Sequence, residues 1–268
     1  MLLRQALPMG LGSALNSIGS RIDVALLLHF SGAAEVGLYS AAYRISGAIN
    51  NIPVALAAAV LPFFSRHSWK TPEMEELVER TLLAAVSTAG LILIFFAVAG
   101  PRLLVWLFGP SYESSADLLQ ILIWAIFPAF ANVVLLHASV SQKVTAAAYT
   151  TAAGTGAAAN ILLNLWWIPL WKARAAAYAT VATELAVCLT YAFLLHQVFG
   201  LPTRRRIVTA ALFGLAMAAT ATALSLEGLG LGILASLAYF AILLGSGTVS
   251  KSDWRFWKGQ VVPSPARK

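Results

Sequence analysis

Four charged side chains interrupt the apolar stretches of this sequence, and they are the residues best suited to do chemistry: Arg21, Asp23, Arg44 and Glu184. A charge at the centre of a membrane helix costs about 2.5–3.5 kcal/mol on insertion scales, so such residues usually face a bundle interior or a wet cavity. Guanidinium groups bind anions bidentately, and intramembrane carboxyl groups bind protons or cations. The sequence therefore predicts a polar pathway through an apolar protein.

Other polar residues accompany these charges at helical spacing. Residues three or four positions apart share one helix face. The stripes are Ser13, Asn16, Ser20 and Asp23; Ser40, Arg44, Gly47 and Asn51, flanked by Tyr39, Tyr43 and Asn50; Thr145, Tyr149, Gly156, Asn160 and Asn164; and Thr180, Glu184 and Tyr191. Packing alone requires small residues and occasional hydrogen bonds, so four polar stripes indicate a hydrated central cavity. The predicted pathway residues are Arg44, Asp23, Glu184, Arg21, Asn50, Asn51, Asn160 and Asn164.

Structural roles are the alternative for each charge. Arg21 can extend to the membrane surface, Asp23 can cap or pair locally, and Arg44 and Glu184 can make interhelical bonds.

Neither a metal site nor a cofactor is expected. His29, His137 and His196 lie near span ends, and no two share a helix at ligand spacing. The single cysteine, Cys188, excludes a disulfide framework and a cysteine-based metal site.

Composition requires that these residues be positioned by membrane helices. The chain has 268 residues, of which 59% are hydrophobic and only 11% are charged, and its mean hydropathy is +0.78. An average soluble domain has about 25% charged residues, so a soluble domain and a disordered chain are both excluded. A membrane helix needs about 20 mainly apolar residues. Eight stretches meet this need: 7–28, 36–64, 77–100, 118–140, 144–170, 175–198, 207–225 and 229–246. The predicted fold class is an all-α polytopic membrane bundle of about eight transmembrane helices.

The predicted organisation has three parts. Residues 1–199 form a six-helix lobe, residues 200–250 add a C-terminal helix pair, and residues 251–268 form a basic tail. Trp254 and Trp257 stand among basic residues of the tail, a mixture typical of a membrane interface. Within the longest connection, Thr71-Pro72 predicts the start of a short amphipathic helix over residues 72–80.

Basic residues indicate the orientation. Thirteen of the 18 Lys and Arg residues fall on the side of the N-terminus, and three fall on the other side. The positive-inside rule then predicts that both termini are cytoplasmic. The same bias accounts for the net charge of +7 and the pI near 9.8, so no nucleic-acid partner is expected.

Several runs, in order and spacing, resemble a known family. They are Arg21-Ile-Asp23 with the following Val-Ala-Leu-Leu-Leu, Glu35-Val-Gly-Leu-Tyr-Ser-Ala-Ala-Tyr-Arg44, Ala-Val-Leu-Pro62 after Pro53, Leu107-Phe-Gly-Pro-Ser-Tyr-Glu-Ser-Ser115, Asn160-Ile-Leu-Leu-Asn164 with Ile168-Pro169, and Ala175-Ala-Ala-Tyr-Ala-Thr180 with Thr183-Glu184. Over about residues 5–200 the chain resembles the polysaccharide flippases, the Wzx-type exporters of the multidrug/oligosaccharidyl-lipid/polysaccharide (MOP) superfamily. One departure is Trp171-Lys-Ala-Arg174, where the family often has glycines.

The resemblance implies a function. Family members have twelve or fourteen spans in two lobes, and the matching part is the second lobe, as in MATE/MOP-type transporters. The implied activity is flipping of a polyprenyl-pyrophosphate-linked oligosaccharide across the bacterial inner membrane for surface polysaccharide biosynthesis. Arg44 and Arg21 would contact the pyrophosphate, and Asp23 or Glu184 would carry a coupling proton or cation. Sugar hydroxyls would be bound by Asn50, Asn160 and Asn164.

Three alternatives remain open: a drug/cation antiporter of the same superfamily, a membrane enzyme of the polysaccharide pathway, and a non-transporting fragment or accessory subunit. An enzyme is not expected, because the short outer loops carry no paired carboxylates. Rocking of two lobes needs two bundles. The expected partners are therefore membrane lipids, the lipid-linked oligosaccharide, and a missing or separately encoded N-terminal lobe or a second copy of the chain.

Overall fold

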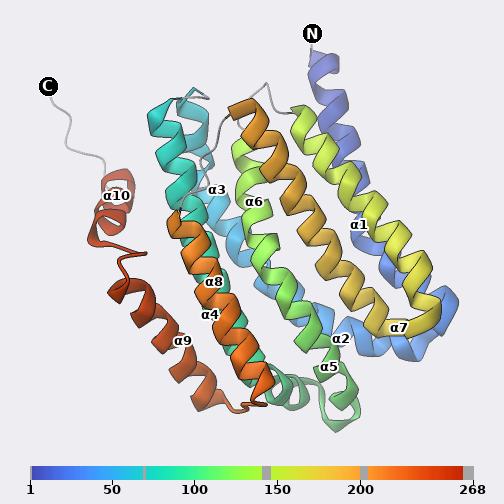
Figure 1. Ribbon diagram of the computed structural model, residues 1–268. Coiled ribbons are helices and arrows are strands. Elements are labelled where there is room, and N and C mark those ends of the chain that lie inside the picture. Colours follow the sequence, from blue (N-terminus) through green and yellow to red (C-terminus); the bar gives the residue numbers. More distant parts are fainter. Residues whose placement is uncertain (1, 69–70, 141–145, 200–204, 262–268) are drawn as a thin grey trace, which may run out of the picture.

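The computed structural model describes residues 2–68, 71–140, 146–199 and 205–261, and over these ranges the regular elements are all helices (Figure 1). They are α1 (Leu2–Ser31), α2 (Ala33–Ile49), α3 (Asn51–Arg66), α4 (Pro72–Phe108), η1 (Pro110–Tyr112), α5 (Glu113–Leu122), η2 (Ile123–Ala125), α6 (Ile126–Val140), α7 (Ala146–Phe199), α8 (Arg205–Ala223), α9 (Leu229–Gly245) and α10 (Lys251–Val261).

Each of the eight predicted stretches contains a helix. Among the described residues, five segments are long and apolar enough to cross a membrane: Ala33–Arg66, Pro72–Phe108, Pro110–Val140, Ala147–Leu195 and Arg205–Ala223. Leu229–Gly245 is a shorter apolar helix, and α1 lies beside α7 (Figure 1). The prediction of an all-α membrane helix bundle is confirmed.

Some predictions fall on residues outside the described ranges. Of the basic residues used for orientation, Lys70, Lys143, Arg204, Arg267 and Lys268 lie there, as does Thr145 of one polar stripe.

Prolines break two of the predicted spans. The stretch 36–64 divides at Asn50 into α2 and α3, because Pro53 has no N–H to donate to the Ile49 carbonyl. The stretch 118–140 contains the 3₁₀ turn η2, whose middle residue, Trp124, is four residues before Pro128. The proline ring excludes a regular α-helical bond to the carbonyl of Trp124, so the chain tightens there.

Helix α4 begins as the sequence predicts but does not end where expected. Thr71 caps it by accepting a hydrogen bond from the Met74 amide at 3.3 Å, and Pro72 occupies the first turn. The prediction of a separate helix over residues 72–80 was wrong, because nothing after Arg80 interrupts the helix and α4 continues to Phe108.

The long α7 is a helical hairpin. Its helical path is interrupted at Lys172, which has φ 50° and ψ −128°, and the two arms run side by side in opposite directions (Figure 1). The Glu35 carboxylate accepts from the Ala173 amide at 3.4 Å and lies 3.8 Å from Lys172 Nζ. Ala173, Ala175 and Ala176 are buried at the turn. The absence of the family's glycines therefore does not prevent a tight hairpin.

Helices α8 and α9 pack against α4. Their close approach depends on small residues: a Cβ on Gly90 of α4 would overlap the Tyr239 ring, and a Cβ on Gly214 would lie 3.2 Å from the Gly90 Cα. The Tyr239 hydroxyl donates to the Ala210 carbonyl at 3.0 Å, which joins α9 to α8. The two helices thus cover α4 and leave α1, α2, α6 and α7 to form the polar interior described next.

Candidate functional site

A cavity of about 350 Å³ lies among α1, α2, α3, α6 and both arms of α7. Most of its polar wall comes from residues of the predicted stripes. The polar lining is Asp23, Tyr43, Asn50, Asn132, Tyr149, Asn160, Thr180, Thr183, Glu184 and Tyr191. The sequence prediction that several polar helix faces converge on one cavity therefore agrees with the geometry.

Asp23 is held at the junction of three helices. Its side chain is on α1 and the residue is only 3% exposed. The Tyr39 hydroxyl of α2 donates to Asp23 Oδ2 at 2.7 Å, and the Val24 amide donates to Oδ1 at 2.8 Å. The same Tyr39 oxygen lies 3.1 Å from Thr180 Oγ1 on the second arm of α7. Both carboxyl oxygens are thus hydrogen-bonded by neutral groups.

Glu184 occupies the opposite part of the wall. Asn132 Nδ2 of α6 donates to Glu184 Oε2 at 2.8 Å and to the Glu184 carbonyl at 3.0 Å. These two bonds fix the second arm of α7 against α6. On the first arm, Asn164 Nδ2 donates to Asn160 Oδ1 at 2.9 Å, so Asn160 faces the cavity while Asn164 supports it from behind.

The cavity contains acidic groups without a balancing cation. Among the described side chains, neither Asp23 nor Glu184 makes an ion pair. Within the same residues, Asn50 Oδ1, Asn132 Oδ1 and Thr183 Oγ1 are buried with no hydrogen-bond partner. Buried polar atoms are normally satisfied by protein or water. This wall can therefore hold water and a proton or small cation next to the carboxyl groups.

Four predicted pathway residues do not line this cavity. Asn164 is buried beside Asn160, and Arg21, Arg44 and Asn51 are exposed on α1, α2 and α3. Tyr43 does line the cavity, whereas the adjacent Arg44 faces outward, as does Arg21.

Sequence reasoning missed Asn132 and gave Tyr39 only a flanking place. Asn132 is a single amide in the otherwise apolar α6, and that isolation was the available signal. The importance of Tyr39 comes from its bond to Asp23, which joins residues on different helices and has no local sequence signature.

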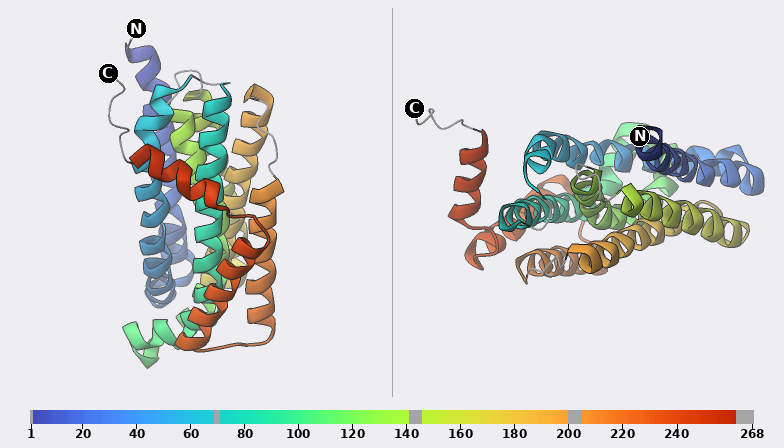
Figure 2. Two further views of the ribbon diagram at one scale, coloured as in Figure 1. Left: turned by 90° about the vertical axis from the view of Figure 1, so that its left-hand side faces the viewer. Right: turned by 90° about the horizontal axis from the view of Figure 1, so that it is seen from above.

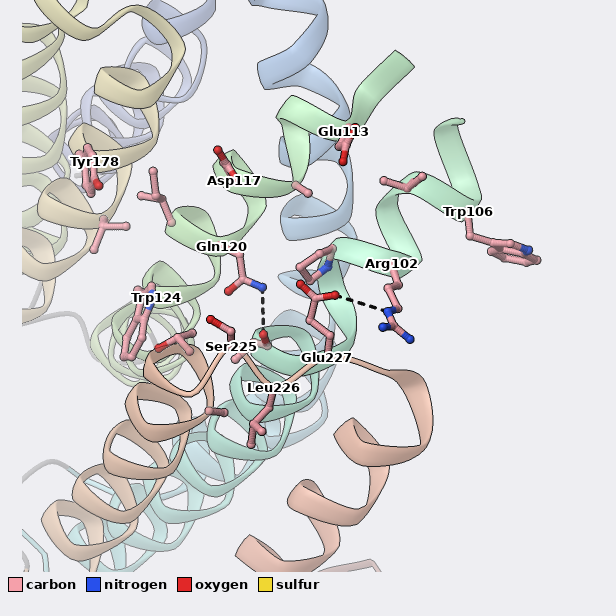
Figure 3. A pocket seen from close by; sticks show the side chains of 18 residues that line it. Arg102, Trp106, Glu113, Asp117, Gln120, Trp124, Tyr178, Ser225, Leu226 and Glu227 are labelled. Carbon is pink, nitrogen blue, oxygen red and sulfur yellow. Dashed lines mark hydrogen bonds and ion pairs between the residues drawn. The ribbon is translucent and has the colours of Figure 1, made fainter. Parts of the chain in front are cut away.

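A second cavity of about 930 Å³ opens between α4, α5, α7 and α8 (Figure 3). Gln120 Nε2 donates to the Ala97 carbonyl at 2.9 Å there, and Arg102 lies 3.5 Å from Glu227. Both partners of this ion pair are half exposed or more, so it contributes little stability. Elsewhere in the described residues, no three His, Cys, Asp or Glu side chains are grouped to hold a metal. The first cavity is therefore the better candidate site.

Comparisons with known proteins give one family match and two solved structures with a similar fold. Residues 1–68 match the family model described as Polysaccharide biosynthesis protein. The solved structure of "Lipid II flippase MurJ, inward closed conformation" is similar, with a TM-score of 0.70 and 15% identity over 90% of this chain and 54% of that chain. A second is "Outward-facing conformation of a multidrug resistance MATE family transporter of the MOP superfamily", with a TM-score of 0.57 and 18% identity over 81% of this chain and 51% of that one.

The chain has the same fold as these two solved structures. The family match and the shared fold support the flippase-family assignment made from the sequence, and the matched residues 1–68 contain Asp23, Tyr39 and Arg44. The chain spans about half the length of the two solved structures that it resembles. No curated protein matches it.

Proposed function

We propose that this chain is one lobe of a flippase that moves a polyprenyl-pyrophosphate-linked oligosaccharide across the bacterial inner membrane, with both termini in the cytoplasm. The observation that carries the proposal is the polar cavity, which is lined by the buried Asp23 and the half-buried Glu184, neither with an ion-pair partner among the described residues. Such residues inside a membrane bundle are expensive and usually functional. The match of residues 1–68 to the polysaccharide biosynthesis family favours a lipid-linked sugar as substrate.

The outward-facing arginine fits the anionic part of this substrate. Arg44 is exposed on α2, and an arginine exposed to the lipid interior costs about 2.5–3.5 kcal/mol on insertion scales. A guanidinium binds a pyrophosphate bidentately, and its positive charge cancels part of the negative charge of the pyrophosphate. Arg44 therefore faces the substrate path between this lobe and a second one, where the sugar-pyrophosphate passes while the lipid tail remains in the bilayer.

The carboxyl groups fit the coupling step. A proton or cation bound at Asp23 or Glu184 changes the charge of the wall formed by α1, α6 and α7. Because Asp23 is bonded to Tyr39 of α2, a change at Asp23 acts directly on the helix that carries Arg44. Binding at one site thereby alters the position of the other, as alternating access requires.

A drug/cation antiporter is the second candidate, and the aromatic lining of the cavity favours it. Tyr43, Tyr149 and Tyr191 stand beside the two acids, a combination that suits an organic cation. The similar MATE structure has the same fold.

The two functions are separated by one experiment in cells. In a strain lacking the chain, the flippase proposal expects the labelled lipid-linked oligosaccharide to accumulate in the inner leaflet, protected from a membrane-impermeant lectin. Re-expression of the chain restores lectin access, and susceptibility to cationic drugs is unchanged. Unchanged lectin access with increased drug susceptibility would contradict the flippase proposal in favour of the antiporter.

A further inference from the structure

Helix α10 crosses the side of the bundle at an angle to the membrane helices rather than running parallel to them (Figure 2). It follows α9 after residues 246–250 and sits at the edge of the bundle away from α1 (Figure 2). A helix in this orientation does not span a membrane. The question is therefore what fixes it in place and what its other face contacts.

One carboxylate fixes α10 to two membrane helices. Asp253 is 6% exposed. Its Oδ1 accepts from Arg80 Nη1 of α4 at 2.6 Å, and its Oδ2 accepts from Arg206 Nη2 of α8. The Ser250 amide also donates to Oδ2, at 2.8 Å. Arg206 Nε donates in addition to the Thr248 carbonyl at 2.9 Å, so the turn before α10 is held as well.

The electrostatics of this contact support a bond that persists at neutral pH. Burial alone would raise the pKa of the Asp253 carboxyl, but the hydrogen bonds from Arg206 and Ser250 outweigh it and hold that pKa below its ordinary value. The Arg80 guanidinium also lies 4.7 Å from the centre of the Phe256 ring. Phe256 and Trp257 pack against the core of the bundle. One face of α10 therefore packs against the rest of the protein.

The opposite face carries an exposed basic and aromatic stripe, which we define as Lys251, Trp254, Arg255 and Lys258. These positions are three, four and seven apart and share one helix face. Trp254 is 58% exposed. Among the described side chains, none of the three cations of the stripe makes an ion pair. The stripe thus has three unpaired positive charges around a large indole.

The stripe lies level with the start of the apolar run of α8. Arg206 is the second residue of α8, immediately before the apolar run that begins at Ile207. Its bond to Asp253 places α10 where the apolar part of the span starts. Tryptophan is enriched at this level, and amphipathic helices with Lys and Arg lie in this plane.

We infer that α10 is an interfacial anchor whose stripe binds the headgroups of anionic phospholipids. Charge complementarity selects this partner, since the surface of anionic lipid is negative and each nearby Lys or Arg strengthens binding by about fivefold. Asp253 is the positioning residue: it turns the stripe outward and transmits contact with the lipid to α4 and α8.

The test measures lipid binding to the full chain in neutral detergent micelles, by native mass spectrometry with phosphatidylglycerol and phosphatidylcholine as probes. The K251Q/R255Q/K258Q variant should weaken phosphatidylglycerol binding at least about tenfold and leave phosphatidylcholine binding unchanged. The matched control R102Q/K172Q/R174Q removes three cations elsewhere and should change phosphatidylglycerol binding less than about twofold. Equal weakening in both triple variants, or none in the first, would overturn the inference.

Variants of Asp253 test the positioning role. Asp253→Asn keeps every cation of the stripe but loses the charged contacts to Arg80 and Arg206, so preference for phosphatidylglycerol should fall by at least about threefold. Asp253→Glu should restore most of it, which also shows that loss in Asp253→Asn is not general misfolding. Wild-type preference in Asp253→Asn would contradict the role given to this carboxylate.

Discussion

At the scale of single residues, the two acids of the cavity are held by neutral donors. Asp23 receives the Tyr39 hydroxyl and the Val24 amide, and Glu184 receives the Asn132 amide. Neutral hydrogen bonds stabilise a carboxyl group in place without cancelling its charge. A proton or a cation can therefore still bind to each carboxylate. A carboxylate in a structural ion pair differs, because a basic side chain already balances its charge.

Replacing Asp23 by Asn should remove that coupling while keeping the shape of the side chain. The asparagine oxygen still accepts from Tyr39, so folding is preserved, but the group no longer binds a proton or cation. We expect export of the lipid-linked sugar to fall at least about tenfold at an unchanged protein level in the membrane. Asp117→Asn, at an exposed carboxylate outside the cavity, is the control and should export normally. Equal losses of protein and export would instead assign Asp23 a structural role.

Arg44 offers a second test at this scale. Arg44→Ala should impair export at least about tenfold without lowering the amount of membrane protein, because the pyrophosphate loses a bidentate contact. Arg44→Lys keeps the charge without the planar fork and should be intermediate. Quantitative immunoblotting alongside the lectin assay separates the effects. If Arg44→Ala lowers protein level and leaves export per molecule intact, Arg44 serves the fold alone.

At the scale of elements, apolar length predicted the helices well, but the sequence could not show which of their faces meet. The eight stretches follow from hydropathy alone, and the hairpin turn at Lys172 falls between two of them, 144–170 and 175–198. The break at Asn50 inside the stretch 36–64 follows from Pro53. Helical spacing identified the polar faces carrying Asp23, Asn160 and Glu184. It could not show that Arg44 faces away from the cavity that Tyr43 lines. Helical spacing shows which residues share a helix face, but it does not show which other helix packs against that face.

The hairpin of α7 contains a strained residue that mutation can relieve. Lys172 has φ 50° and ψ −128°, a conformation that glycine adopts at little steric cost. Strain of this kind costs about 1–3 kcal/mol. Glycine relieves the strain, but it also adds backbone entropy to the unfolded chain, which offsets part of the gain in stability. Lys172→Gly should therefore stabilise the protein by on the order of 1 kcal/mol, measured as a higher thermal midpoint in detergent. Lys172→Ala keeps the strain and should not raise the thermal midpoint. A lower midpoint for Lys172→Gly would contradict this interpretation of the turn.

At the scale of the whole molecule, the start of α1 and helix α10 lie toward the same end of the bundle (Figure 1). The Lys and Arg excess at that end predicts that it is cytoplasmic. The test uses a variant with Cys188 replaced by serine and a cysteine in place of Arg174, whose side chain is exposed at the hairpin turn of α7. We expect an impermeant reagent outside the cell to label a cysteine at position 174 and not a cysteine at position 205; the opposite pattern would reverse this orientation.

The central claim is that this chain forms one lobe of a two-lobe lipid-linked oligosaccharide flippase. Exposed Arg44 and Asn51 need a facing partner, and the chain spans about half of the structures whose fold it shares. The most direct measurement is flipping of a fluorescent polyprenyl-pyrophosphate glycolipid in proteoliposomes. The measurement compares two kinds of sample. One is the monomeric chain, isolated by size exclusion. The other is the assembled form, which is either a dimer of the chain or the chain reconstituted with the polypeptides that copurify with it. The account predicts flipping by the assembled form, loss of that activity in Arg44→Ala, and none by the monomer. Flipping by a demonstrably monomeric preparation, or flipping that Arg44→Ala does not affect, would contradict it.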